Sequence, residues 1–170
     1  MAGITARIID YPSAIDSAQH LPGGFTVIFV GELPMTRISS SELTTDQCQK
    51  GLRAAINILH KWRTSDEQAC RILHVSRHTY ISAQQCDPAW SIALDTDQMQ
   101  RISLVLNIHA ALRLTFENPK NTYGFVSMPN DNDFFNGRSP LEVMSQGDLN
   151  LLEETYRRID ALLLGPHGQL

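Results

Sequence analysis

Side chains that could hydrogen-bond or carry charge at a binding site are concentrated in one polar segment, SRHTYISAQQ, at residues 76 to 85. The run offers hydroxyl, imidazole, amide and guanidinium groups. Such groups can hydrogen-bond base edges or phosphates when they lie near the start of a helix, where free backbone N–H groups also attract phosphate. The candidate DNA-binding residues are Ser76, Arg77, His78, Thr79, Tyr80, Ser82 and Gln84. An ordinary helical hairpin with a polar face is the alternative explanation.

The other reactive side chains form no recognisable catalytic or metal-binding pattern. His74 and His78 are four positions apart, but a predicted turn separates them, and no acid or cysteine completes a ligand set. The sequence contains no legible Ser-His-Asp order, no glycine-rich phosphate loop and no H-E-x-x-H motif. We therefore expect no metal, no cofactor and no enzymatic activity, and we expect His109 to be a hydrogen-bonded core histidine.

Composition predicts a cytoplasmic protein with a real core. The chain has 170 residues, 42% hydrophobic content and a net charge of −4, which disfavours general affinity for nucleic acid. The charge is uneven, because residues 50–85 carry six basic and two acidic side chains, whereas residues 130–161 carry three arginines and seven acids. Three cysteines, Cys48, Cys70 and Cys86, lack a C-x-x-C spacing and are expected to be reduced. No secretion signal or membrane span is legible.

The elements that must position the polar run are predicted to be helices. Residues 45–62 carry apolar residues at helical spacing, and Asp95 can cap a long helix from Thr96 to Phe116. That second helix is apolar nearly all round, which is typical of the centre of a domain. Residues 1–44 differ, because proline and glycine are frequent there, and the run FTVIFV predicts a strand that can pair with residues 6–9.

Residues 64–85 are predicted to form two short helices joined by a tight turn. Thr64 or Ser65 can cap the first helix, and Ser76 can cap the second. His74 stands at the turn position where glycine is usual, and it is expected to adopt a positive φ. The second helix contributes a single formal cation, so we expect DNA binding to require a dimer.

The stretch NGRSPLEVMSQGDL, residues 136–149, predicts a short helix that meets a longer one at a defined angle. Ser139 and Glu142 can form a capping box, with Pro140 at the first helical position. Gly147 is expected to end the helix in the left-handed conformation, and Asp148 can cap the helix that follows. Arg138 lies beside a helix N-terminus, where a cation is unfavourable, so we expect it to face an acid or a partner.

Three segments taken in order, RISLVLNIHAALRLTFENP, MPN and FFNGRSPLEVMSQGDL, resemble the toxin-binding domain of the Xre/MbcA/ParS antitoxin family. The resemblance covers residues 97–164, and the preceding helix-turn-helix pattern extends it to residues 45–164. Pro129 and Asn130 match the family's P-N element, whereas Phe125 stands where the family usually has tryptophan. The residues that match the G-R-[ST]-P-[LV] element and its surroundings are Asn136, Gly137, Arg138, Ser139, Pro140 and Leu141.

The resemblance implies an antitoxin of a type II toxin–antitoxin system. Its C-terminal domain would bind a RES-type toxin and occlude the NAD cleft, and its helix-turn-helix would repress the shared operon. Residues 136–141, together with Gly165 and His167 of the C-terminal tail, are the candidate toxin contacts. The expected partners are the toxin, operator DNA and a second copy of the chain within a larger complex.

The expected architecture is mainly α, in three parts. Residues 1–44 form an extension with short strands, residues 45–94 form a helix-turn-helix domain and linker, and residues 95–170 form a helical toxin-binding domain. A stand-alone transcriptional regulator without a toxin is the alternative function, and a scaffold that only oligomerises is a third. The toxin's reaction, the operator sequence, the stoichiometry and the role of residues 1–44 stay open.

Overall fold

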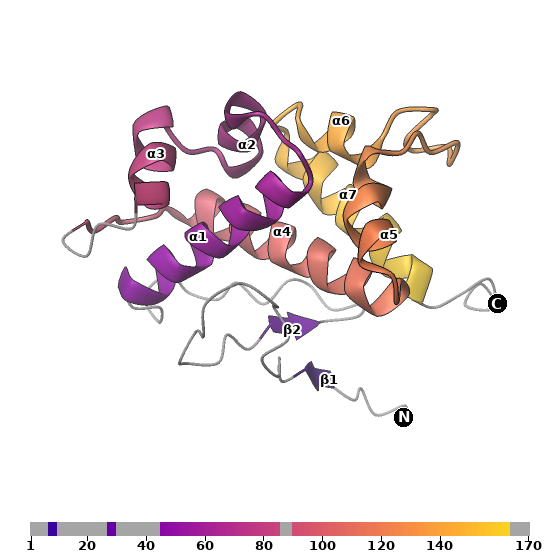
Figure 1. Cartoon of the computed structure of the whole chain (residues 1–170), viewed down its shortest axis with the longest axis horizontal. Coiled ribbons are helices and arrows are strands. Elements are labelled where there is room, and N and C mark those ends of the chain that lie inside the picture. Colours follow the sequence, from indigo (N-terminus) through magenta and orange to yellow (C-terminus); the bar gives the residue numbers. More distant parts are fainter. Residues whose placement is uncertain (1–6, 10–26, 30–44, 86–89, 164–170) are drawn as a thin grey trace. The chain divides into compact units, whose positions relative to one another are not determined.

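The chain forms two compact units, Met1–Ile38 and Ser39–Leu170. The structure is a computed structural model, and it describes residues 7–9, 27–29, 45–85 and 90–163 (Figure 1). In the first unit, β1 (Arg7–Ile9) pairs antiparallel with β2 (Val27–Phe29), and Ile8 lies opposite Ile28. The larger unit contains the candidate sites.

The described part of the second unit is helical, which confirms the predicted mainly α fold. Its elements are α1 (Thr45–Lys61), α2 (Asp66–Leu73), α3 (Arg77–Gln85), α4 (Thr96–Thr115), α5 (Pro119–Gly124), the 3-10 helix η1 (Phe125–Ser127), α6 (Pro140–Met144) and α7 (Leu149–Asp160). None of the described helices is long and apolar enough to cross a membrane.

Local hydrogen bonds explain where several of these helices begin. Ser65, Asp95 and Ser139 each cap a helix with a complete capping box, in which the side chain three residues later bonds back to the cap's own N–H. Asp148 caps α7 by accepting from the backbone N–H groups of Asn150 and Leu151, at 2.7 and 3.2 Å. These caps satisfy backbone donors that a helix start leaves free, so the sequence-based helix starts are confirmed.

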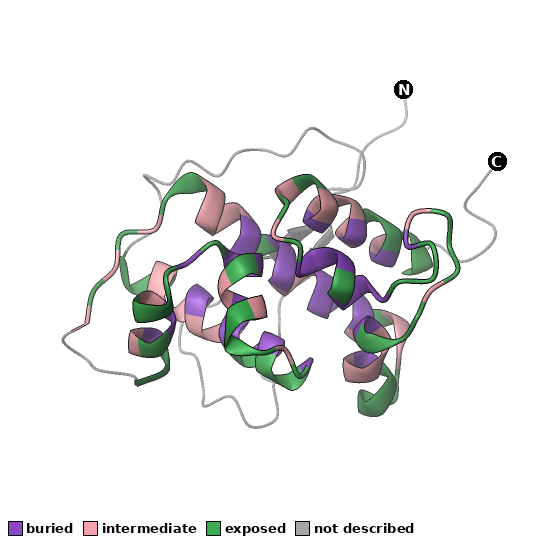
Figure 2. Ribbon diagram, turned by 90° about the horizontal axis from the view of Figure 1, so that it is seen from above, coloured by how far each residue is buried: buried purple, intermediate pink, exposed green. Residues whose placement is uncertain are grey.

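Helix α4 forms the centre of the second unit and packs against both α1 and α7 (Figure 1). Its buried residues cover most of its circumference, as its sequence predicts. Figure 2 shows the buried residues gathered between the helices and the exposed residues on their outer sides. Fully buried side chains such as Leu52, Leu59 and Ile108 each contribute roughly 1.5–3 kcal/mol by leaving water. One hydrophobic core therefore joins side chains from residues 45–94 and 95–170.

Candidate functional site

Helices α2 and α3 meet at a tight turn whose geometry follows from His74 at the end of α2 and Ser76 at the start of α3. His74 ends α2 in the left-handed conformation with φ 53°, as its position predicts. Its backbone N–H bonds the carbonyl oxygen of Arg71 at 3.3 Å. Ser76 then caps α3, because its Oγ accepts from the backbone N–H of Thr79 at 3.0 Å. The turn thus places the start of α3 at the surface, with α3 packed on α1 and α2.

The predicted DNA-binding residues divide into three groups by burial. Ser76, Arg77, His78 and Gln84 are exposed, and Thr79 and Ser82 are half-buried. The Thr79 hydroxyl also lies 2.9 Å from the Ser76 Oγ, so these two side chains already bond each other. Of the four exposed side chains, Ser76 is engaged in the cap of α3, and Arg77, His78 and Gln84 are available to meet a ligand at the surface.

Tyr80 corrects the sequence-based prediction, because it belongs to the core. Only 2% of the residue is exposed, so it cannot reach a base or a phosphate. Burial, followed by the charge and hydrogen bonding of Asp66, raises the pKa of the Tyr80 hydroxyl to about 12. The ring fills the interface behind α3, and the hydroxyl is neutral at physiological pH.

Ile81, which the sequence analysis did not select, takes the exposed place instead. It is 39% exposed on α3, beside the exposed Arg77, His78, Gln84 and Gln85. The sequence contained a signal for this arrangement, because Ile81 is apolar and directly follows Tyr80. Adjacent side chains on a helix point in different directions, so only one of the two can face the core squarely.

The positive charge of residues 50–85 does not collect on α3. Lys50 pairs with Asp46 at 2.6 Å, the Arg53 guanidinium lies over the Trp90 ring, and Lys61 lies over the Tyr123 ring. The remaining three cations, Arg63, Arg71 and Arg77, are exposed. Among the described residues, no ion pair engages any of these three.

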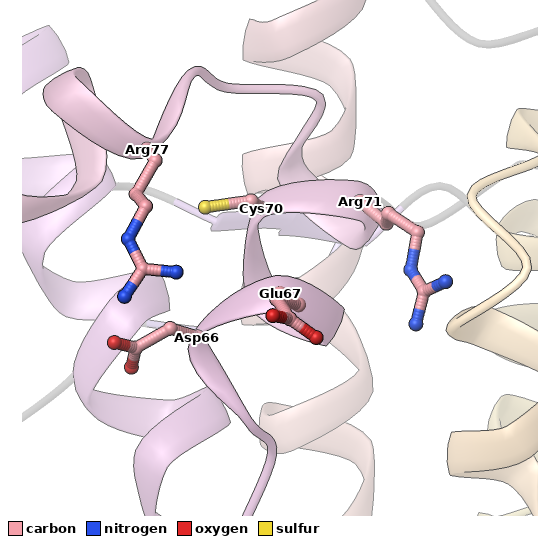
Figure 3. A pocket seen from close by; sticks show the side chains of 5 residues that line it. All are labelled: Asp66, Glu67, Cys70, Arg71 and Arg77. Carbon is pink, nitrogen blue, oxygen red and sulfur yellow. The ribbon is translucent and has the colours of Figure 1, made fainter.

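A shallow, open hollow of about 340 Å³ lies where α2 meets α3. Asp66, Glu67, Cys70, Arg71 and Arg77 line it, and Figure 3 shows Arg77 reaching from α3 towards Asp66 of α2. Two acids and two arginines leave no net charge to attract an ion. Burial, and secondarily the Asp66 charge, raises the pKa of the Cys70 thiol, although Arg77 opposes them. Cys70 is therefore a neutral thiol, poorly suited to nucleophilic chemistry.

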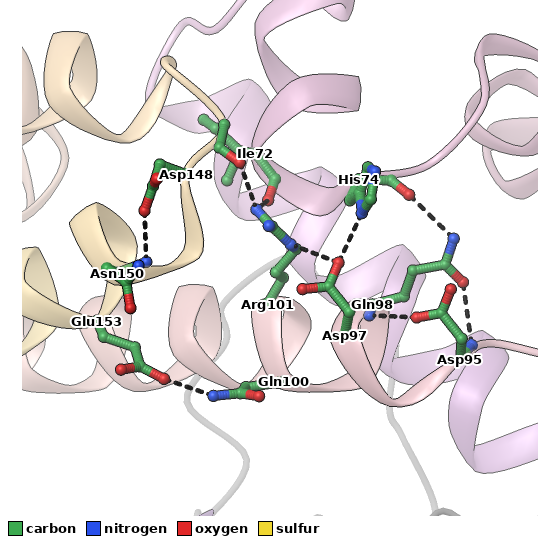
Figure 4. A network of polar contacts seen from close by, with 11 residues as sticks. Ile72, His74, Asp95, Asp97, Gln98, Gln100, Arg101, Asp148, Asn150 and Glu153 are labelled. Carbon is green, nitrogen blue, oxygen red and sulfur yellow. Dashed lines mark hydrogen bonds and ion pairs between the residues drawn. The ribbon is translucent and has the colours of Figure 1, made fainter.

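A hydrogen-bond network ties the α2–α3 turn to α4 (Figure 4). The His74 ring nitrogen Nδ1 lies 2.6 Å from the Asp97 carboxylate, and Gln98 donates to the His74 carbonyl oxygen at 2.9 Å. Arg101, which is 5% exposed, donates to Asp97 at 2.8 Å. Burial alone would raise the pKa of Asp97, but the bonds from Arg101 and His74 outweigh it and lower that pKa. This network fixes the turn and hence the direction of α3.

The loop between η1 and α6 is closed by its own backbone. The backbone N–H of Asn130 bonds the Arg138 carbonyl oxygen at 3.2 Å, and that of Gly137 bonds the Asn130 carbonyl oxygen at 3.0 Å. Asn136 and Gly137 have positive φ angles of 50° and 78°. Exposed Asp131 and Asp133 lie within the loop. These bonds hold the ends of the loop together.

The candidate toxin contacts divide at the start of α6. Asn136, Gly137 and Arg138 are exposed, whereas Ser139, Pro140 and Leu141 are buried. The first three are therefore accessible at the surface, while the other three anchor α6. Gly165 and His167 lie outside the described residues.

Arg138 bonds the loop rather than an acid. Its guanidinium donates to the carbonyl oxygens of Phe135 and Phe134, at 3.1 and 3.4 Å. The predicted capping box beside it is confirmed, because Glu142 accepts from the Ser139 backbone N–H at 2.6 Å. That bond, the Ser139 hydroxyl and the Arg138 charge lower the pKa of Glu142 despite a small opposing effect of desolvation. Gly147 adopts φ +81° at the end of the α6 turn, as predicted.

His109 is a core residue, as its sequence position predicts. It is 3% exposed, stacks on the Tyr123 ring at 5.5 Å between centroids and lies 3.4 Å from the Tyr123 hydroxyl. Burial, with smaller effects of Arg113 and Lys61, lowers its pKa to about 4. Within the described residues, no cluster of three histidine, cysteine or acidic side chains could hold a metal ion.

Comparison with known proteins places the chain beside one uncharacterised bacterial protein. The chain is 29% identical over 111 residues to uncharacterized protein y4oB of Sinorhizobium fredii (strain NBRC 101917 / NGR234). The similar region covers 65% of this chain and 81% of that protein. No family model matches the chain, and no solved structure matches it significantly.

Proposed function

We propose that this protein is an antitoxin with two binding functions. Helices α2 and α3 form a helix-turn-helix that binds operator DNA and represses the operon. Residues 95–170 form a domain that binds a RES-type toxin and occludes its NAD cleft, and residues 1–44 are a strand-containing extension outside both. The observation that carries the DNA function is the exposed face of α3, and the toxin function rests on the resemblance of residues 97–164.

The chemistry of α3 supports DNA binding. The helix contains no acidic residue, and its first turn presents Arg77 and His78 to solvent beside the Ser76 cap. A single helix fits the major groove of B-DNA, where arginine can bond guanine and glutamine can bond adenine. Asp66 and Glu67 on α2 limit the attraction of one copy for phosphate, so two copies on a two-fold-symmetric site are expected to bind together.

The loop closed by Asn130 and Arg138 supports the toxin function. Its exposed residues are already fixed by backbone hydrogen bonds, so binding costs less conformational entropy than ordering a flexible loop. An interface of roughly 800 Å² on each partner is ordinary for a specific complex. Steric occlusion requires no reactive group on the antitoxin.

The DNA function is tested with the full chain and its own promoter fragment at low salt. Arg77→Ala should weaken binding about fivefold or more, equivalent to about 1–3 kcal/mol, because a base contact is lost. Arg157→Ala, which removes an exposed arginine from α7, is the matched control and should bind normally. A wild-type chain that fails to shift promoter DNA removes this function.

The toxin function is tested by co-expression with the neighbouring gene and purification of any complex. A RES-like protein should co-purify, and Arg138→Glu or truncation after Leu164 should weaken growth rescue without unfolding the chain. Arg157→Glu is the matched control for the charge reversal. Intact promoter binding without any co-purified toxin would instead favour the stand-alone regulator.

A further inference from the structure

Ile81 occupies the middle of the exposed face of α3. At about 100° per residue, Arg77 and Gln84 lie on one side of Ile81, and His78 and Gln85 lie on the other. The two buried residues of the helix, Tyr80 and Ala83, lie about 100° and 160° round the helix from Ile81, outside this exposed face. A branched apolar side chain is thus surrounded by four exposed side chains that can hydrogen-bond.

The central position on such a face is the one that enters a groove most deeply. In the major groove of B-DNA, hydrogen-bonding edges are interrupted by one apolar group, the C5-methyl of thymine. A side chain without donors or acceptors at this position cannot pair with the other base edges, and it would leave their polar groups without partners. The exposed face of α3 is therefore complementary to a stretch of major groove that has a thymine methyl group at its centre and hydrogen-bonding base edges around it.

We infer that Ile81 is a specificity-determining residue that contacts the C5-methyl group of a thymine in each half-site of the operator. The inference rests on the proposed DNA-binding function and extends it to a particular base. The glutamines beside Ile81 suit adenine, and Arg77 suits guanine, so the thymine lies among A·T pairs with a guanine towards the start of α3.

The test uses a random pool of duplex DNA, from which the full chain selects a preferred sequence. Each thymine of that duplex is then replaced in turn by deoxyuridine, which removes only the methyl group. For the wild-type chain, one thymine per half-site should be sensitive, with affinity reduced about fourfold for the loss of one buried methyl group at roughly 0.8 kcal/mol. Fluorescence anisotropy at fixed salt measures the affinities.

Ile81→Ala should bind the thymine duplex several-fold more weakly and should no longer distinguish it from the deoxyuridine duplex. The matched control is Leu114→Ala, which shortens another exposed apolar side chain, on α4, and should keep the full discrimination. Unchanged far-UV circular dichroism and thermal unfolding would show that both variants are folded.

Four results would overturn the inference. If no thymine is sensitive in the wild type, or if Ile81→Ala keeps the discrimination, Ile81 does not contact a thymine methyl, although the DNA-binding function stands. If Ile81→Ala instead reduces dimerisation in sedimentation experiments while methyl discrimination persists, the side chain contacts a second copy. If the wild type selects no sequence from the pool, the DNA-binding function fails as well.

Discussion

Arg101 donates a hydrogen bond from Nη1 to the carbonyl oxygen of Gly147, 3.0 Å away and 46 positions later in the chain. The same nitrogen donates to the carbonyl oxygen of Ile72 at 3.3 Å. One buried guanidinium on α4 therefore joins the end of α2 to the turn between α6 and α7. This contact connects the proposed DNA-binding helices to the proposed toxin-binding helices.

Replacing Arg101 with methionine should destabilise the fold strongly. The substitution keeps much of the side-chain length but leaves the carbonyl oxygens of Ile72 and Gly147 without this donor. It also removes one of the two side-chain partners of Asp97, the other being His74. We expect a loss of about 3 kcal/mol in the free energy of unfolding, measured by urea denaturation.

Arg157→Met is the control for that substitution. Arg157 is 68% exposed and its ion pair with Glu154 spans 3.6 Å, so its loss should change stability by less than about 0.5 kcal/mol. Equal stabilities of the two variants would show that the Arg101 contacts are not structural.

Gly147→Ala should be destabilising by roughly 1–2 kcal/mol. The residue has φ +81°, which is strained for alanine, and an added Cβ would meet the Arg71 carbonyl oxygen at 3.3 Å. The effect should appear as a lower midpoint in urea unfolding. Because Gly147 adjoins α2, hydrogen exchange should also quicken in the last turn of α2.

Gly124→Ala provides the contrast. Gly124 has helical angles of φ −80° and ψ −32°, and an added Cβ would make an ordinary contact at 3.5 Å with the end of the Met128 side chain. We expect a neutral or slightly stabilising effect of up to about 1 kcal/mol. A destabilisation as large as that of Gly147→Ala would contradict the conformational explanation.

His109 should make the protein less stable as the pH falls below neutrality. The folded state lowers its pKa from 6.5 to about 4, so the unfolded chain binds this proton more tightly. The stability is therefore complete above about pH 6.5 and is lost progressively down to about pH 4, by roughly 3 kcal/mol in total. Urea unfolding at a series of pH values measures the slope.

His109→Gln should flatten that slope, whatever it does to stability at neutral pH. His60→Gln, the same substitution at an exposed position near the end of α1, is the matched control measured in parallel. A slope between pH 6.5 and 4 that survives His109→Gln would assign the acid sensitivity to other groups.

Tyr80→Ala and Ile81→Ala should differ greatly in stability, although the two residues are neighbours. Tyr80 is 2% exposed, and its truncation should cost about 3–5 kcal/mol through lost packing and a cavity. Ile81 is 39% exposed, and its truncation should cost no more than about 0.5 kcal/mol. Thermal unfolding compares them directly, and similar costs would mean that α3 is rotated from the described orientation.

The helix starts could be predicted because each depends on residues close in sequence. Ser65, Asp95, Ser139 and Asp148 bond backbone groups two or three positions away, so their effect is legible without knowledge of the fold. The left-handed conformations of His74 and Gly147 were predictable for the same local reason.

The sequence by itself therefore determined the mainly helical fold, the capped helix starts and the polar character of α3. Only the tertiary structure decided which side of α3 faces solvent, because Tyr80 and Ile81 are both apolar neighbours and packing against α1 and α2 admits one of them. Tyr80 is buried, where Asp66 can accept its hydroxyl hydrogen bond, and Ile81 is left outside. The Arg101–Gly147 contact likewise required the fold, since no local rule relates residues 46 positions apart.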